Sequence, residues 1–548
     1  MKLFKYITVL FAGLALVACS EIDNIVPESG NMLASQLQET NAAVPTRATA
    51  SFNGLFNGLG LPGYCGYNKP DDFAVLMMLF CNDLESADAL IPDSGYNWFS
   101  VCGEYSSRSA NYRNPTIRYR TPYNIISNVN DFLAGFGEDV EDQESLYMIA
   151  QSKALRAYAY MLLAPSFQFI QKNGEFNSEA PCVPICSPDI EDPANNPRAT
   201  VGAIYEIILK DLNEAVEGLE GYERTNKMYI DKQVALGLRA RAYLDMGKYA
   251  EAAADAAAAM EGYEPASIAE VSTPTFYEIS EHNWIWGFDM DPAKANNYIY
   301  ATTSSWLRSF SGYSYSAACQ CYTCINKMLY DKIPASDVRK GWWLDENLYS
   351  PLLEGLTWNA GDQGSASGQA IADFEYDDKL AFIPYTNVKF GCITIGTQDN
   401  AEDMPLMRVE EMILLRAEAL AKSGKEAEGK KLLEDFVKTY RDPSYSAAAG
   451  GRSFADEVWF QRRVELWGEG FGIFDVKRLG KNMVRFHDNA KSTNQPDAFR
   501  FNMAADDQWL LMKFANGELN TNFAIVDNSE GSLPVMDQNP KLRDGVTD

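Results

Sequence analysis

The feature that most constrains the fold is a helix-pair pattern between Asp231 and Tyr263. Aromatic and small residues recur there at the spacing of a tetratricopeptide repeat: Tyr243, Gly247, Tyr249, Ala252 and Ala259. Glycine permits the turn, the tyrosines fill the gap between the helices, and the alanines let the second helix lie close to the first. One such pair cannot bury its own apolar face. The sequence therefore predicts further helices packed against it.

Other segments supply these helices. Apolar residues recur on one helical face in residues 151–169 and 203–219, and Thr200 is placed to cap the second segment. A second pair spans residues 409–437 and is interrupted at Ser423-Gly424. We expect a mainly α fold, in which a helix-pair scaffold lies mainly in residues 120–265 and 405–480.

The regions between the helices have a different composition. From about residue 268 to 395 the helical periodicity fades, and six of the ten tryptophans occur there, which predicts an irregular insertion. A shorter irregular segment is predicted from Gly63 to Arg113. Loops carried on a rigid frame commonly hold binding groups. No Pro/Gly/Ser-rich linker divides the later chain, so residues 47–548 are expected to form one body.

The amino terminus has the pattern of an export signal. Lys2 and Lys5 precede an apolar run from Tyr6 to Val17, which is too short to span a bilayer and is typical of a signal peptide. The run ends at Cys19, at a sequence typical of lipoprotein processing. We expect residues 1–18 to be removed, Cys19 to carry the lipid anchor, and the polar residues 19–46 to form a flexible tether. The acidic residues that follow Cys19 favour the exterior of the outer membrane.

Charge and cysteine content exclude several classes of function. A net charge of −28 excludes nucleic acid as a partner. Without Cys19, nine cysteines remain, so at least one thiol is unpaired in an oxidising compartment. The cluster of Cys319, Cys321 and Cys324 has too few histidines near it for zinc, which leaves a local disulfide or buried thiols. We expect no metal and no cofactor.

Short motifs recur in a fixed order along most of the chain. They lie in residues 123–130, 154–158, 181–184, 197–212, 405–419 and 462–478, and include Ala154-Leu155-Arg156-Ala157-Tyr158. Their order and spacing resemble the SusD/RagB family. The resemblance implies a tetratricopeptide-like scaffold under a loop-rich ligand face. It also implies a non-catalytic surface lipoprotein that binds oligosaccharides and delivers them to a SusC-like TonB-dependent transporter. Some relatives take up peptides instead. Gln461 and Gly472 depart from the family pattern, which weakens the ion-pair network expected there.

The resemblance also assigns a ligand face. Proteins hold sugar rings by stacking aromatic rings on the C–H face and by hydrogen-bonding the hydroxyl rim. In the family, one loop from the first half and aromatic residues of the central insertion form the glycan site. The candidates in this chain are Tyr96, Asn97, Trp98, Trp306, Tyr313, Tyr315 and Trp342. Core packing is the alternative for each tryptophan, and Trp98 is the preferred ligand contact. If the chain is extended at Trp342 and Trp343, only one of these two side chains can face a ligand.

An enzyme and a peptide-binding protein are the alternatives to a glycan binder. A glycosidase needs two well-placed carboxylates, but Glu465, Glu469 and Asp475 lie among arginines at helical spacings, which is typical of structural ion pairs. No phosphate loop, nucleophile elbow or metalloprotease motif occurs. We therefore expect no enzymatic activity. A peptide-binding surface protein of the RagB type is the alternative. Three other tryptophans are interpreted as structural: Trp459, Trp467 and Trp509.

Overall fold

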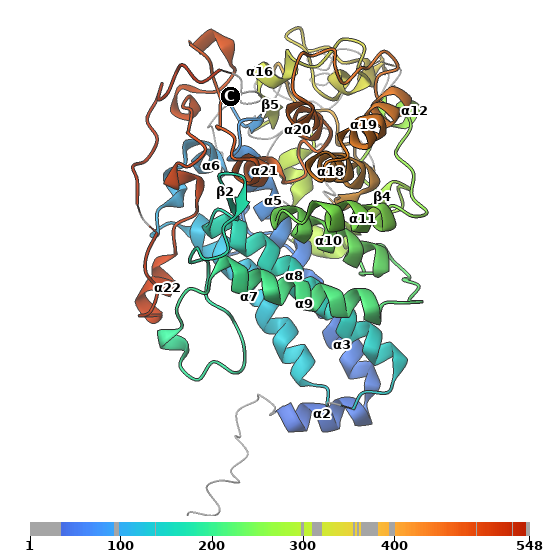
Figure 1. Ribbon diagram of the computed structural model, residues 1–548, viewed down its shortest axis with the longest axis vertical. Coiled ribbons are helices and arrows are strands. Elements are labelled where there is room, and N and C mark those ends of the chain that lie inside the picture. Colours follow the sequence, from blue (N-terminus) through green and yellow to red (C-terminus); the bar gives the residue numbers. More distant parts are fainter. Residues whose placement is uncertain are drawn as a thin grey trace, which may run out of the picture.

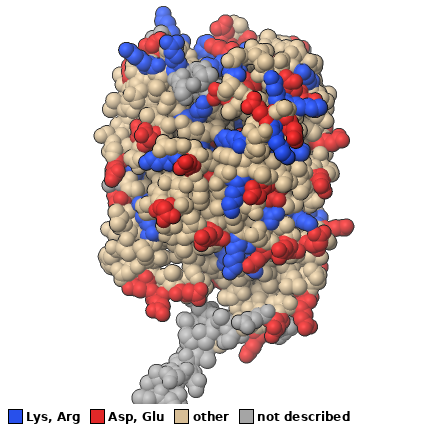
Figure 2. Space-filling view, viewed as in Figure 1, with Lys and Arg blue, Asp and Glu red and all other residues tan. Residues whose placement is uncertain are grey.

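The computed structural model describes residues 34–92, 98–137, 139–297, 301–309, 321–354, 357–358, 361–362, 382–393, 401–488, 490–528 and 530–543. This part of the chain is mainly helical, with four short two-stranded sheets (Figure 1). None of the helices in these ranges combines the length and apolar character that a membrane span requires. Basic and acidic side chains are interspersed on the face seen in Figure 2, with acidic groups along its lower edge.

The frame is a continuous stack of paired helices. Its members are α7 (Arg113–Ala134), α8 (Gln143–Phe167), α9 (Val201–Gly218), α10 (Lys232–Asp245), α11 (Tyr249–Ala259), α18 (Val409–Lys422), α19 (Glu426–Tyr440) and α20 (Phe454–Glu465). Each of α7 to α11 packs on the next, α11 packs on α18, and α18 packs on both α19 and α20 (Figure 1). The contact between α11 and α18 joins two halves of the scaffold that the insertion separates in sequence.

Local sequence explains the helix pairs. Between α10 and α11, Gly247 adopts a φ of 72°, a left-handed conformation that costs glycine little. Ala252 and Ala259 are fully buried, as close packing of the two helices requires. At the start of α9, the Thr200 hydroxyl accepts a hydrogen bond from the Ala203 N–H at 3.1 Å. The predicted helix pairs, the cap at Thr200 and the mainly α fold are confirmed.

Two predictions about helices were wrong. The segment from Gly63 to Arg113 contains α5 (Ala74–Leu84), which is buried on every side and therefore shows no polar face in its sequence. The tether predicted for residues 19–46 contains α2 (Ala34–Ala43), followed by α3 (Pro45–Leu55). The Gln38 amide donates to the Ala134 carbonyl at 3.0 Å, so α2 contacts the end of α7 through polar groups. Such contacts do not require a repeat of apolar residues in the sequence, and none marks this helix.

The remaining elements are short. The longest sheet pairs β4 (Trp284–Phe288) antiparallel with β8 (Met404–Arg408), and β1 (Ala89–Leu90) pairs with β5 (Cys324–Ile325). The second pairing ties the 63–113 segment to the central insertion. The other strands are β2 (Gln171–Lys172), β3 (Glu175–Phe176), β6 (Thr357–Trp358) and β7 (Gly361–Asp362). The short helices are α4 (Asn57–Gly60), α6 (Ser100–Glu104), α12 (Ile268–Val271), α13 (Pro292–Asn297), α14 (Thr303–Leu307), α16 (Lys327–Tyr330), α21 (Gly472–Leu479) and α22 (Asn516–Thr521).

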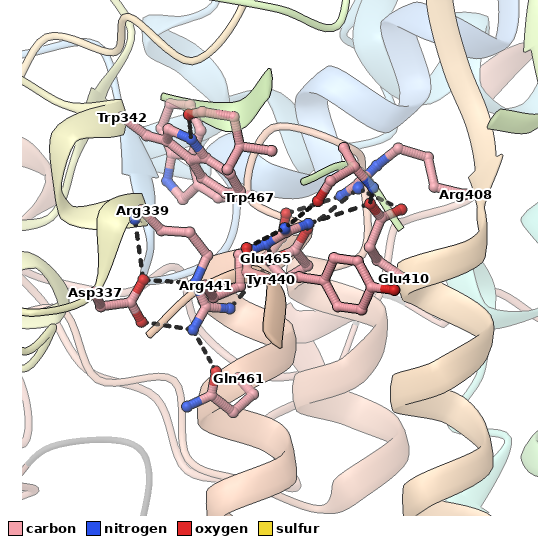
Figure 3. A network of polar contacts seen from close by, with 12 residues as sticks. Asp337, Arg339, Trp342, Arg408, Glu410, Tyr440, Arg441, Gln461, Glu465 and Trp467 are labelled. Atoms are coloured by element: carbon pink, nitrogen blue, oxygen red, sulfur yellow. Dashed lines mark hydrogen bonds and ion pairs between the residues drawn. The ribbon is translucent and has the colours of Figure 1, made fainter. Parts of the chain in front are cut away.

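A buried ion-pair network holds the insertion on the frame (Figure 3). Glu465 of α20 lies 3.2 Å from Arg339, 3.2 Å from Arg408 and 2.8 Å from Arg441, and all four side chains are fully buried. Arg339 belongs to the central insertion, whereas Arg408 ends β8 and Arg441 follows α19. Burial raises the pKa of Glu465, but the three guanidinium groups outweigh burial and hold it well below its ordinary value.

The network includes further residues of the family motif. Glu469 accepts from Arg408 at 2.8 Å and from the Lys389 ammonium at 2.7 Å. Gln461, which replaces a common acidic residue, accepts a hydrogen bond from Arg339 as a neutral partner. Asp475 pairs with Arg462 and Arg478. The interpretation of Glu465, Glu469 and Asp475 as structural ion-pair partners is confirmed.

Candidate functional site

Several predicted site residues lie outside the described residues. These are Tyr96, Asn97, Tyr313 and Tyr315, and the predicted lipid anchor Cys19. Their proposed roles remain predictions. Among the predicted ligand contacts, the structure places three tryptophans, Trp98, Trp306 and Trp342.

Trp306 and Trp342 are core residues, which corrects their prediction as ligand contacts. Both have no exposed surface, so neither offers a face for a sugar. The Trp306 indole N–H donates to the Pro70 carbonyl at 3.1 Å, and that of Trp342 donates to the Val271 carbonyl at 3.0 Å. Trp343 is also buried, so neither member of the pair faces a ligand. Their Gly- and Ser-rich surroundings suggested surface loops, but the insertion folds over its own aromatic side chains.

Trp306 nevertheless joins the two regions that the resemblance assigned to the ligand face. Its ring meets Phe99 edge-on, with 4.6 Å between ring centroids. Phe99 also packs against Phe80 of α5 at 4.9 Å. Phe99 follows Trp98 directly, so the buried Trp306 supports the loop that carries Trp98. The loop of the first half and the central insertion therefore meet at this point.

Trp98 is half-buried and lies among charged side chains. The Arg113 guanidinium carbon is 5.2 Å from the centre of the indole ring, and the Lys69 ammonium is 6.0 Å away, both within the range of a cation–π interaction. Arg113 also binds Asp71, with 2.8 Å between Nη2 and Oδ2 and 3.2 Å between Nε and Oδ2. Burial raises the pKa of Asp71 and the Arg113 contact opposes this rise. Trp98 therefore contacts a cation that is itself fixed by an ion pair.

The same surface continues along α7. Arg120 follows Arg113 by two helical turns, about 10 Å along the axis, and its exposed guanidinium lies 5.8 Å from the centre of the Tyr67 ring. The Asp72 carboxylate holds the Tyr67 segment by accepting its backbone N–H at 2.8 Å. We call the set of Tyr67, Lys69, Trp98, Arg113 and Arg120 the Trp98 face. Sequence reasoning found only Trp98, although the spacing of Arg113 and Arg120 on one helix face was a usable signal.

A groove of about 430 Å³ lies beside the Trp98 face, and Arg120 borders both. One wall is α7, with Tyr119, Tyr123 and Asn124, and the others are the loop from Pro184 to Asn196 and residues 515–522. The Tyr123 hydroxyl donates to the Pro184 carbonyl at 2.6 Å, which holds the loop against the helix. The lining combines apolar and aromatic side chains with asparagines, Arg120 and Glu518, a mixture suited to binding small polar molecules that have apolar faces.

The described residues offer binding groups rather than a metal centre. Among them, no three His, Cys, Asp or Glu side chains are placed to hold a metal ion. Asp71, the acidic partner of Arg113 beside Trp98, is engaged in this ion pair. The aromatic rings, guanidinium groups and amides of this surface are suited to stacking and hydrogen bonding.

Two family models match successive parts of the chain. Residues 76–244 match a model described as starch-binding and associating with the outer membrane, and residues 383–541 match a model described as the SusD family. Together the two models cover more than half of the chain and lie on both sides of the central insertion. The chain belongs to the SusD family. No curated protein sequence matches it.

Solved structures of the SusD superfamily have the same fold. A SusD-like carbohydrate-binding protein from Bacteroides vulgatus is 22% identical, with a TM-score of 0.69 over 88% of this chain and 97% of that one. A SusD superfamily protein from Bacteroides thetaiotaomicron is 20% identical, with a TM-score of 0.69 over 88% and 99%. A laminarin-binding SusD-like protein is 17% identical, with a TM-score of 0.59 over 89% and 99%. These SusD relatives share the architecture at low sequence identity.

Proposed function

We propose that this SusD-family protein is a non-catalytic binder of oligosaccharides at the surface of the outer membrane. The observation that carries the proposal is the Trp98 face, in which an indole and a phenol ring stand beside three basic side chains. Aromatic rings bind the C–H faces of sugars, and guanidinium and ammonium groups donate hydrogen bonds to hydroxyl oxygens. Two comparisons add support: one family model is described as starch-binding, and one structural neighbour as laminarin-binding.

The proposal includes an anchor and a partner. Cys19 carries the lipid, and the folded body delivers its ligand to a SusC-like TonB-dependent transporter. The apolar leader that ends at Cys19 supports the anchor. The transporter rests on the family resemblance. Residues 34–43 form the docked helix α2, which shortens the stretch of chain between the lipid and the body.

The absence of catalysis is part of the proposal. A glycosidase requires one carboxyl group that gives a proton and a second that attacks or activates water. Glu465 and Glu469 are buried and held by arginines, so neither is available to a substrate. Release of reducing ends from any glycan by the purified protein would contradict this part of the proposal.

Calorimetric titration with a panel of soluble glycans tests the binding function. Replacing Trp98 by alanine removes the ring and its neighbouring cation contacts, and truncation of such an anchor commonly weakens binding by about 2 kcal/mol, or about 30-fold. Tyr349→Ala is the matched control, because Tyr349 is an exposed aromatic residue of the central insertion outside the Trp98 face. Equal affinities of the Trp98→Ala variant and the wild type would refute the assigned site. Binding of peptides, with no glycan bound, would favour the peptide-binding alternative.

A further inference from the structure

Two buried cysteines face each other beneath the Trp98 segment. The Sγ atoms of Cys81 and Cys102 are 3.6 Å apart, and neither residue has exposed surface. Cys81 belongs to α5 and Cys102 to the short helix α6, which packs on α5. The Asn114 amide donates to the Cys102 sulfur at 3.2 Å. The two sulfur atoms are thus in van der Waals contact inside the core.

Three other described cysteines have different surroundings. The Cys65 sulfur contacts the Thr121 hydroxyl at 3.2 Å, the Cys182 thiol donates to the Ala164 carbonyl at 3.8 Å, and the Cys324 sulfur lies 3.8 Å from the Thr386 hydroxyl. Each of these sulfur atoms has an oxygen partner. The Cys81 sulfur differs from these three, because it contacts two other sulfur atoms, Cys102 Sγ at 3.6 Å and Met77 Sδ at 3.3 Å.

We propose that Cys81 and Cys102 form a disulfide bond in the exported protein. A disulfide has an S–S distance of about 2.05 Å, so the two sulfur atoms must approach by about 1.6 Å. Rotation of the two side chains about their Cα–Cβ bonds can supply much of this movement. The predicted signal peptide directs the chain to a compartment in which disulfides form and persist.

The bond forms by thiol–disulfide exchange while the chain folds. One cysteine, as the thiolate, attacks a sulfur of an oxidant disulfide, forms a mixed disulfide and releases the oxidant's first thiol. The second cysteine then attacks the mixed disulfide at the first cysteine's sulfur and releases the oxidant's second thiol. Two electrons pass to the oxidant, a thiol:disulfide oxidoreductase or a small disulfide, and the two thiol protons end on its released thiols. Because both sulfur atoms are buried in the folded chain, exchange precedes the closing of the core.

The bond would close the part of the chain that carries Trp98. Residues 82–101 lie between the two cysteines and include β1 as well as Trp98 and Phe99. One disulfide that joins the two ends of this segment restricts its conformations in the unfolded chain and links α6 covalently to α5. Fixing a binding segment before the ligand arrives lowers the entropy cost of binding.

Mass spectrometry of the exported, full-length protein tests the proposal. The protein is denatured with an alkylating agent present and no reductant, then cleaved. No lysine or arginine lies between the two cysteines, so trypsin cannot separate them, whereas cleavage after Glu85 does. We expect the two fragments to stay joined, with a mass two hydrogens below their sum, and to separate on reduction. Alkylation of both Cys81 and Cys102 without prior reduction would overturn the proposal.

Two controls assign the bond and measure its effect. Cleavage at glutamate leaves Cys65 and Cys81 in the same fragment, so a link to the Cys102 fragment could come from either cysteine. If Cys81 makes the bond, the two fragments stay joined in the Cys65→Ser variant. Refolding the wild type in reductant should lower its Tm by about 3 °C, the order expected for a closed loop of about 20 residues in a body of this size. The Cys81→Ala variant should show no such response to reductant. An equal response in that variant would assign the effect to other thiols and refute the pair.

Discussion

The buried network predicts that Glu465→Gln strongly destabilises the fold. Glutamine has nearly the shape of glutamate but lacks its charge, and it replaces one acceptor oxygen with an NH₂ group. Arg339, Arg408 and Arg441 would then face a donor and lose the carboxylate that they share. Glu410 and Asp337 compensate part of this loss, because they contact Arg441 and Arg339.

The expected size follows from the burial of the network. Removing one partner of a buried ion pair commonly costs about 3–5 kcal/mol, because the remaining charge stays uncompensated. Unfolding entropy of about 2 cal/mol/K per residue gives about 1 kcal/mol/K for about 500 residues, so this loss corresponds to a decrease in Tm of about 3–5 °C. Glu465 has a folded pKa below its unfolded value. Its contribution is therefore present above the unfolded pKa and is lost as pH falls through the folded one.

Scanning calorimetry of wild type and variant at neutral and acidic pH measures this effect. Asp435→Asn is the matched control, since it neutralises one partner of the exposed Lys431–Asp435 pair and should leave Tm nearly unchanged. The difference between wild type and Glu465→Gln should shrink at acidic pH, where glutamate of the wild type also becomes neutral. A decrease in Tm no larger than that of the control would refute the argument that the network holds the insertion on the frame.

Two further predictions concern the contact between α5 and the turn before α21. Burial raises the pKa of Asp83 to about 7, although its carboxylate accepts the N–H groups of Gly470 and Gly472. Because this folded pKa lies above the unfolded one, Asp83 contributes stability at low pH that is lost between about pH 4 and 7. In calorimetry, Asp83→Asn should abolish this part of the pH dependence of Tm, and an unchanged profile would contradict the assignment. Gly470→Ala should lower Tm by several degrees. Gly470 has a φ of 92°, and an added Cβ would lie 2.5 Å from the Leu79 Cβ. A Tm within 1 °C of the wild type would show that the turn relaxes to accept the methyl group.

The sequence predicted best where local chemistry decides the structure. Local features of this kind are Gly247 at a turn, Thr200 at the start of a helix and the alanines between α10 and α11. Each acts within one or two helical turns, so the spacing of these residues in the sequence was sufficient to predict the helix pairs. The structural role of Glu465 and Glu469 was also predicted from the neighbouring arginines, but the cations that hold them, such as Arg408, come from distant parts of the chain. The order of the family motifs then gave the fold.

The candidate site was less predictable, because exposure depends on contacts between distant segments. Trp306 and Trp342 occur in loop-like sequence, yet both are buried, and the Pro70 and Val271 carbonyls accept their indole N–H groups. Lys69 and Arg120 were not predicted as binding residues. Their place in the candidate site depends on the Trp98 and Tyr67 rings that the fold puts beside them.

By itself, the sequence determined the helix-pair frame, the expected export signal and the kind of side chain that a sugar site needs, because these follow from local spacing and composition. Only the tertiary structure decided which of the three described candidate tryptophans is partly exposed, which cations accompany it and that Cys81 meets Cys102. Those outcomes depend on long-range packing, in which a side chain is buried or exposed according to partners tens or hundreds of residues away.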